Sequence, residues 1–241
     1  NLTSSYISRW QTDALTVGDK KVQLPISNAS DVVFDAVVNW GDGTSSRVLK
    51  TNLSSQSHTY ANAGVYDIEI GGSFSGMPLN NVLTAEQLVD VKQWGANPWK
   101  SMASMFYSTH LTSFSASDLP NLSECTSFNR LFYASQFNGN LNNWDVSHVI
   151  DMSYVFAENV VFNQPLNNWN TASVTDMSFM FSGADSFNQP IGNLNTSNVT
   201  KMTGMFSSND SFNQSINNWN TSKVTEMSSM FSLASAFNQS L

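Results

Sequence analysis

The sequence predicts a β-rich protein in which an N-terminal β-sandwich precedes a right-handed solenoid of strand plus short helix or 3-10 units. The later part of the chain repeats with a fixed period of 25 residues, which is the sequence signature of a solenoid. The first 78 residues lack that period and contain short runs of strand-forming residues between glycine turns, as small all-β domains do. We therefore expect two domains, residues 1–78 and residues 79–241, the second with about six units.

The 25-residue repeat is clearest in three consecutive copies. The segment FNQPLNNWNTASVTDMSFMF at 162–181 returns as FNQPIGNLNTSNVTKMTGMF at 187–206 and as FNQSINNWNTSKVTEMSSMF at 212–231. One such unit cannot bury its own apolar face, so neighbouring units must stack into a continuous core. The phenylalanines that mark the period are Phe137, Phe162, Phe187, Phe212 and Phe237.

Two spacings alternate within each unit. Leu141, Trp144 and Val146 have the LxxLxL spacing of a leucine-rich-repeat strand, in which the last two residues point inward on a pleat of period two. The later positions Val174, Met177, Met180 and Phe181 fall on one face of a short helix or 3-10 turn. We expect the strands of successive units to form a parallel sheet along one side of the solenoid.

Most large apolar residues of the repeat are expected in its core. Nine of the ten methionines occur at repeat positions among Phe and Trp, where methionine usually fills gaps. The lone cysteine, Cys125, is expected to be buried too. An asparagine follows each marker phenylalanine, and we expect these side chains to form a hydrogen-bonded ladder. The positions assigned to the tryptophan column are Trp94, Leu119, Trp144, Trp169, Leu194 and Trp219, and the ladder positions are Asn138, Asn163, Asn188, Asn213 and Asn238.

The N-terminal region is predicted to contain strands at 30–40 and 65–70. The tetrapeptide at 41–44 reads Gly-Asp-Gly-Thr, which predicts a tight turn. Asp42 is expected to form this turn, although calcium binding by its carboxylate is left open. His58 is expected to hydrogen-bond within the sandwich, because no catalytic partner lies at a suitable spacing.

Composition excludes several classes of partner. Only 12% of the residues are charged, the net charge is -8 and the pI is about 4.6. No basic face exists to bind nucleic acid or an anionic membrane surface, and no apolar run is long enough to span a membrane. The chain begins without Met and stops five residues into a new unit, so we expect a fragment of a longer protein.

The sequence predicts that the protein is not an enzyme and needs no cofactor or metal. It contains no HExxH, GxSxG, CxxC or P-loop motif. Its three histidines, His58, His110 and His148, are scattered over different regions. The repeat columns hold Asn where a glycosidase would need Asp.

The candidate binding site is a strip of amide side chains on the sheet side of the solenoid. Amides both donate and accept hydrogen bonds, so the strip suits carbohydrate hydroxyls or an extended peptide backbone. Three alternatives stay open: a merely solvated surface, a structural stalk or spacer, and an ice-binding face of threonines in two columns (Thr171, Thr196 and Thr221; Thr175, Thr200 and Thr225). The strip consists of Asn143, Asp145, Asn168, Asn170, Asn193, Asn195, Asn218 and Asn220.

Two stretches resemble known families. The residues WGDGT at 40–44 and HTYANAGVYDIEI at 58–70 resemble the PKD-type immunoglobulin-like domain, although the Asp-Phe insert before Gly41 is missing. The pattern FNQPLNNWNTxxVTxMxxMF resembles the repeat of BspA-like leucine-rich-repeat surface proteins of bacteria. These resemblances imply an extracellular, surface-anchored protein that adheres to a host or matrix protein or glycan. The unit left open at Leu241 further suggests self-association through that end.

Overall fold

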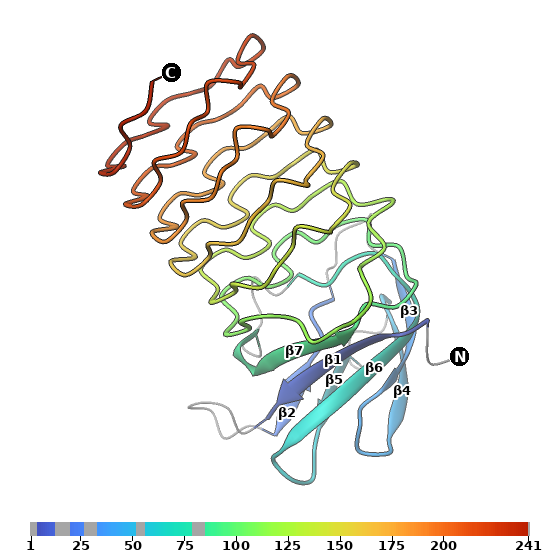
Figure 1. Cartoon of the computed structure of the whole chain (residues 1–241). Helices are drawn as coiled ribbons and strands as arrows, with labels where there is room; N and C mark the ends of the chain where they lie inside the picture. The colour runs from blue at the N-terminus through green and yellow to red at the C-terminus, as the bar shows by residue number, and fades with distance from the viewer. Residues whose placement is uncertain (1–3, 13–19, 27–32, 52–55, 79–84, 241) are drawn as a thin grey trace.

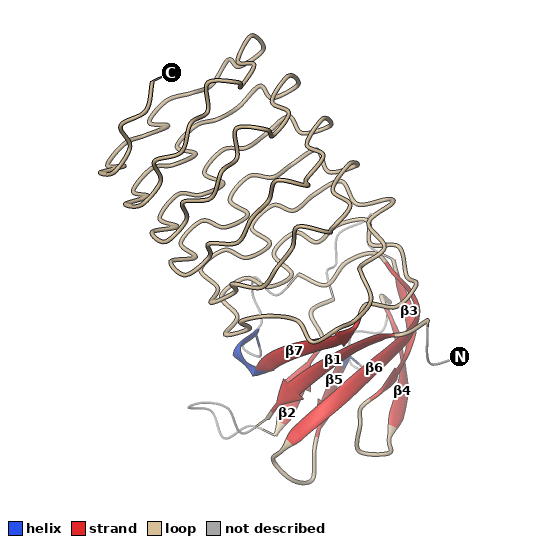
Figure 2. Ribbon diagram, in the orientation of Figure 1, coloured by secondary structure: helices blue, strands red, loops and turns tan. Residues whose placement is uncertain are grey.

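The computed structural model describes residues 4–12, 20–26, 33–51, 56–78 and 85–240. It is β-rich with almost no helix, and the strands gather at one end of the molecule while the rest of the chain winds away as stacked coils (Figures 1 and 2). One 3-10 turn, η2 (Ala85–Gln87), precedes the last strand. The strands are β1 (Tyr6–Gln11), β2 (Lys21–Gln23), β3 (Phe34–Asn39), β4 (Ser45–Leu49), β5 (Ser57–Thr59), β6 (Val65–Phe74) and β7 (Leu88–Gln93).

The strands form two antiparallel sheets. Five of them pair in the order β4-β3-β6-β1-β7, and β2 pairs with β5. The predicted strands at 30–40 and 65–70 correspond to β3 and β6, except that residues 30–32 lie outside the described part of the chain. Strand β3 alternates between buried and exposed residues, as expected for a strand with one face on a core.

The predicted tight turn joins β3 to β4. The Trp40 amide donates to the Thr44 carbonyl at 3.0 Å, and Gly41 has a φ of 81°. A Cβ atom at Gly41 would lie 2.6 Å from the carbonyl oxygen of Asp67 in β6. Glycine is therefore required here both for its backbone conformation and for the close approach of the neighbouring strand.

The sheet and the coils share one hydrophobic core. Strand β7 lies after the predicted domain boundary at residue 78. It nevertheless pairs with β1 at the edge of the five-stranded sheet and leads directly into the first coil. Tyr6 of β1 packs edge-on against Trp99 with ring centroids 5.3 Å apart. Trp94 contacts Trp144 of a later coil at 5.4 Å. The sheet thus covers the first coil and continues its core.

The inter-coil hydrogen bonds do not lie where the sequence predicted them. Residues 141–146 contain turns, and the bridges between coils are isolated parallel bridges through Ser101, Ser127, Asp151, Asp176, Lys201 and Glu226. Main-chain hydrogen bonds between coils continue through the segment that we predicted to be a short helix. Within it, the Tyr154 amide donates to the Ser178 carbonyl at 2.9 Å and the Phe156 amide to the Met180 carbonyl at 3.0 Å. The predicted strand and helix positions are therefore both wrong.

Left-handed residues explain why this segment imitates a helix. Phe179 has a φ of 57° and sits inside a turn that the Met180 amide closes on the Met177 carbonyl at 3.2 Å. Such turns place apolar residues three and four apart, as a helix does, but they free other amides to bond the next coil. The residues in this conformation form two columns, at Ser104, Arg130, Tyr154, Phe179, Gly204 and Ser229 and at Ser108, Ala134, Glu158, Gly183, Ser208 and Leu233.

The core columns follow the prediction with two exceptions. Methionines at repeat positions are buried apart from Met227, which is 42% exposed in the last coil. The tryptophan column is buried, but Leu119 is 55% exposed and Pro120 is buried beside it. Leu119 was therefore wrongly assigned to this column, because Pro120, one residue later, is the buried residue in this irregular coil.

The predicted asparagine ladder is confirmed. The side chains of Asn138, Asn163, Asn188 and Asn213 each accept a hydrogen bond from the main-chain amide of the ladder residue in the next coil, at 2.9–3.0 Å. The following glutamine donates to the same oxygen, as Gln214 does to Asn188 at 3.0 Å. One side-chain oxygen thus satisfies two donors of the next coil, which fixes the register of neighbouring coils.

Candidate functional site

All eight residues of the amide strip are exposed. They belong to four successive coils, each of which contributes two of them. One column holds Asn143, Asn168, Asn193 and Asn218, and the other holds Asp145, Asn170, Asn195 and Asn220. They occupy turns and irregular segments rather than a pleated strand, because the inter-coil ladder lies further along each coil.

In the column that contains Asp145, the side-chain oxygens already accept hydrogen bonds from nearby main-chain amides. In each coil the side-chain oxygen accepts a hydrogen bond from the amide two residues on, as from Ser147 to Asp145 at 3.1 Å and from Ser197 to Asn195 at 3.0 Å. These are Asx turns. Hydrogen bonds from the Ser147 side chain and amide hold the pKa of Asp145 below its usual value. Each asparagine of this column keeps its Nδ2 group and one acceptor site of its oxygen for a ligand.

The side chains of the other column make fewer hydrogen bonds within the protein. The Asn193 Nδ2 donates to the Asn167 carbonyl at 2.6 Å, and the Asn168 amide donates to the Asn142 side chain at 2.9 Å. The carboxamides of Asn143 and Asn218 make no hydrogen bond to another residue that the structure describes. This column therefore offers the freer donors and acceptors of the strip.

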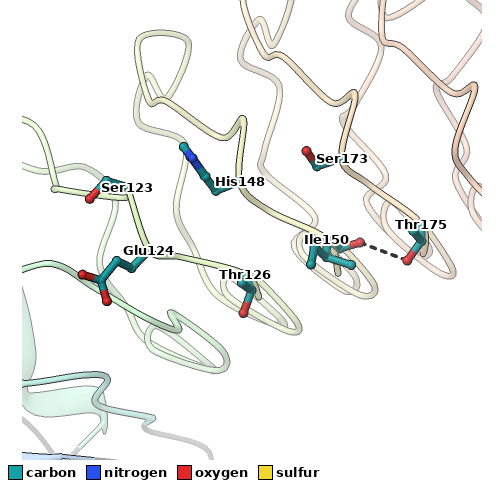
Figure 3. Close-up of a pocket in the computed structure, with 7 residues that line it drawn as sticks. All are labelled: Ser123, Glu124, Thr126, His148, Ile150, Ser173 and Thr175. Atoms are coloured by element: carbon teal, nitrogen blue, oxygen red, sulfur yellow. Dashed lines mark hydrogen bonds between the residues drawn. The ribbon is translucent and has the colours of Figure 1, made fainter.

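An open pocket of about 400 Å³ lies further along the first two of these coils and on the coil before them. It spans three successive coils (Figure 3). Its apolar element is Ile150, which is 44% exposed, and the Thr175 hydroxyl donates to the Ile150 carbonyl at 3.5 Å. The sequence did not predict this pocket, although Ile150 stands 25 residues before Thr175, where the period would place a further threonine. The lining residues are Ser123, Glu124, Thr126, His148, Ile150, Ser173 and Thr175.

The threonine columns serve the array itself. Thr171 and Thr196 are buried and donate to the carbonyls of Asn195 and Asn220 at 3.0 and 3.1 Å. Thr171 and Thr196 therefore point inward and contribute nothing to the surface that ice binding requires, whereas Thr221 in the last described coil is exposed. In the second column the Thr200 and Thr225 hydroxyls donate to main-chain carbonyls of the preceding coil at 3.1 and 3.3 Å.

A compact polar cluster joins residues 40–44 to residues 58–60 in the N-terminal region. The Asp42 carboxylate lies 2.7 Å from Nε2 of His58 and accepts a 2.6 Å hydrogen bond from the Thr44 hydroxyl. The His58 ring stacks on Trp40 with centroids 5.1 Å apart, and the Tyr60 hydroxyl donates to the Trp40 carbonyl at 2.8 Å. The predicted roles of Asp42 in the turn and of His58 in a local hydrogen bond are confirmed.

The electrostatics of this cluster favour the ionised carboxylate. Burial acts to raise the pKa of Asp42, but hydrogen bonds from Thr44 and His58 outweigh it and lower the pKa to about 2. Within the described ranges, no group of three or more His, Cys, Asp or Glu residues is arranged to hold a metal ion. Cys125 is buried as predicted, and its burial raises the pKa of the thiol to about 11.

The fold and the strip define a β-rich protein whose larger part is a stack of 25-residue coils. The chain belongs to the family described as "Mycoplasma protein of unknown function, DUF285", whose model matches residues 100–200 and 173–241. No curated protein and no solved structure matches the chain. No helix in the described part of the chain is long and apolar enough to cross a membrane.

Proposed function

We propose that this chain is an adhesion module of an extracellular, cell-surface protein that binds a host or matrix protein or glycan along the amide strip. The observation that carries the proposal is the exposure of all eight strip residues in two columns over four coils. Repeat arrays commonly use such extended surfaces for binding. No catalytic step, cofactor or metal enters this function.

The chemistry of the strip favours a neutral polar ligand. Asp145 is its one acidic residue, and the rest are carboxamides that can both donate and accept. Sugar hydroxyls and peptide groups also both donate and accept hydrogen bonds. Either ligand can therefore bond to the free Nδ2 and Oδ1 atoms of the column that begins with Asn143. The pocket around Ile150 adds apolar contact area beside these polar groups.

The finer fold assignment belongs to the same proposal. We assign the coils to a right-handed leucine-rich-repeat-like solenoid of the BspA type, supported by the repeat pattern and by the parallel bridges between coils. We assign the N-terminal sheets to a PKD-type immunoglobulin-like domain, supported by the contacts of Trp40 and Asp42 with His58 and Tyr60. Both families imply a place outside the cell.

A binding screen against glycans and extracellular-matrix proteins tests the function. The test variant carries Asn168→Lys, Asn193→Lys and Asn218→Lys, and a ligand held by the strip should be lost. The control carries Gln136→Lys, Val160→Lys and Leu233→Lys, which add the same charge at exposed positions outside the strip. Loss of binding in both variants would contradict recognition by the strip.

A structural stalk or spacer is the second candidate. It is favoured by the Asx turns, which use the side-chain oxygens of half the strip to stabilise the coils themselves. If neither the parent chain nor the variants bind any glycan or matrix protein, the stalk becomes the better proposal.

A further inference from the structure

The pocket around Ile150 is elongated and crosses three successive coils (Figure 3). Glu124, on the earliest of these coils, lies at one end of it. The other residues border the pocket in two rows, with Ser123, His148 and Ser173 in one row and Thr126, Ile150 and Thr175 in the other.

Ile150 occupies a position where the following coils have threonine. The hydroxyls of Thr175, Thr200 and Thr225 each donate to a main-chain carbonyl of the preceding coil, at 3.1–3.5 Å. Isoleucine cannot make this bond, and the side chain of Ile150 is 44% exposed. At this coil the array therefore lacks a hydrogen bond between coils and instead exposes an apolar side chain in a pocket, as ligand sites do.

Short side chains in the row of His148 keep the pocket open. In the later coils the same row holds Asn198 and Lys223, which are longer. The Asn198 Nδ2 donates to a main-chain carbonyl of the preceding coil at 2.8 Å, and the Lys223 Nζ donates to the Asn198 Oδ1 at 2.6 Å. These two side chains thus reach back over the preceding coil, whereas Ser173 lines the open pocket.

The charge of the pocket favours a cation. Glu124 is the one acidic residue among the described lining residues, which include no lysine or arginine. Its carboxylate lies 3.8 Å from Nζ of Lys100, and both side chains are more than half exposed. Such a surface ion pair contributes little, so the carboxylate can accept a second cation. The net charge of -8 also attracts positively charged partners.

We propose that this pocket receives a lysine side chain from an extended segment of a partner protein. The apolar stem of lysine covers Ile150 while its ammonium group reaches Glu124, since lysine combines a four-carbon stem with a compact charge. The paired, two-pronged contact that arginine prefers would compete with Lys100 for both carboxylate oxygens.

This proposal rests on the proposed function in one respect, that the chain binds a protein. It narrows the ligand class, because a neutral glycan has neither an apolar stem nor a positive charge. The pocket adjoins the amide strip, since Asp145 accepts from the Ser147 amide at 3.1 Å and the Ser147 hydroxyl lies 3.2 Å from Nδ1 of His148. The main chain of the same segment can therefore lie along the strip.

The first experiment titrates the chain with a blocked pentapeptide, Gly-Ser-Lys-Ser-Gly. Two further peptides carry norleucine or glutamate in place of the lysine, so that the stem is kept without the positive charge or the charge is reversed. Backbone amide chemical shifts are followed residue by residue. The lysine peptide should give saturable shifts at Thr126, Ile150 and Thr175, the norleucine peptide should bind more weakly, and the glutamate peptide should not bind. Absence of these shifts, or equal binding of the norleucine peptide, would overturn the proposal.

Two variants of the pocket and two matched controls complete the test. Glu124→Gln should raise the dissociation constant of the lysine peptide about threefold to fivefold, as expected for a partly exposed charge pair. Ile150→Thr, which inserts the residue of the later coils, should raise it at least about threefold through lost apolar contact. The controls are Glu226→Gln, whose carboxylate also forms an exposed ion pair, with Lys201 at 3.7 Å, and Val160→Thr, at a side chain that is 50% exposed. Equal weakening by a control and its pocket variant would contradict the assignment.

The two proposals can fail separately. A protein ligand from the binding screen that is lost in the triple lysine variant of the strip, but is unaffected by Glu124→Gln and Ile150→Thr, would overturn the pocket proposal and leave the strip as the site. Weaker binding in both pocket variants, with the triple strip variant equal to its charge-matched control, would support the pocket and contradict recognition by the strip.

Discussion

The side-chain oxygen of Asn163 accepts a hydrogen bond from the main-chain amide of Asn188, at a distance of 3.0 Å. The same oxygen accepts from Nε2 of Gln189, also at 3.0 Å. Two donors of one coil therefore share a single oxygen atom of the coil before it, and Nε2 of Gln189 also donates to the Asn163 carbonyl at 3.1 Å. This relationship, repeated along the array, sets the register of neighbouring coils and is open to direct test.

We expect Asn163→Ala to destabilise the protein by about 1–3 kcal/mol, because it removes the acceptor from two partly buried donors. Asn143→Ala is the matched control, since its exposed side chain makes no hydrogen bond to a described residue, and it should change stability by less than about 0.5 kcal/mol. Chemical denaturation of both variants measures the difference. Equal midpoints for the two variants would show that the ladder bond contributes nothing.

The left-handed columns predict an unusual effect of glycine. Ala134 is exposed with a φ of 51°, a conformation that costs an L residue about 1–2 kcal/mol. Ala134→Gly should therefore raise the melting temperature, although the larger entropy of glycine in the unfolded chain offsets part of the gain.

Gly183→Ala is the reciprocal test. Gly183 has a φ of 64°, and an added Cβ would lie 2.8 Å from Oε1 of Glu158. This substitution should lower the melting temperature. A fall in melting temperature for Ala134→Gly, or a rise for Gly183→Ala, would contradict the role assigned to these columns.

Among these substitutions, we expect one at Phe181 to cause the largest loss of stability. It is fully buried and stacks between Phe156 at 5.6 Å and Phe206 at 5.7 Å, with Phe187 at 3.9 Å in its own coil. Phe181→Ala should cost about 3–5 kcal/mol through lost burial and the cavity left behind. Phe181→Leu fills much of that cavity and should cost clearly less. Denaturation that leaves the alanine variant as stable as the leucine variant would exclude a packed phenylalanine stack.

Asp42 predicts a defined dependence of stability on pH. Its pKa is about 2 in the folded protein and about 3.9 in an unfolded chain. The lowered pKa means that the ionised group stabilises the fold above about pH 4, and that this contribution is lost as the pH falls toward 2. The stability difference between the parent and Asp42→Asn should therefore shrink between about pH 4 and pH 2. A difference that stays constant over this range would exclude the mechanism.

The sequence predicted the columns of the array better than its local geometry. The asparagine ladder and the buried methionines follow from the period alone, since equivalent residues of stacked units must meet. The helix at Val174–Phe181 was wrong because turns with a left-handed residue, such as that at Phe179, place apolar residues at the same spacings as a helix. No residue type marks this conformation here: Tyr, Phe, Glu and Ser all adopt it.

The sequence predicted which residues of the candidate site are exposed, but not the local geometry around them. The exposure of Asn168 and Asn193 could be expected, since they flank the buried Trp169 and Leu194. The Asx turns of Asn170 and Asn195 and the pocket at Ile150 could not, because they depend on where each coil bends. Leu119 was misplaced because a one-residue shift within an irregular coil leaves no trace in its composition.

The side-chain and main-chain bonds between coils have a consequence for how the length of this molecule can change. Residues 187–211 form one whole period, and their removal would bring Phe212 directly after Ser186 in the place of Phe187. Asn213 would then meet Asn163 as Asn188 does now. Recombination between repeats can therefore change the length of the protein in increments of about 4.8 Å, the spacing of neighbouring strands. In this deletion Ser229 would take the place of Gly204, where a Cβ atom would meet the ring of Phe179.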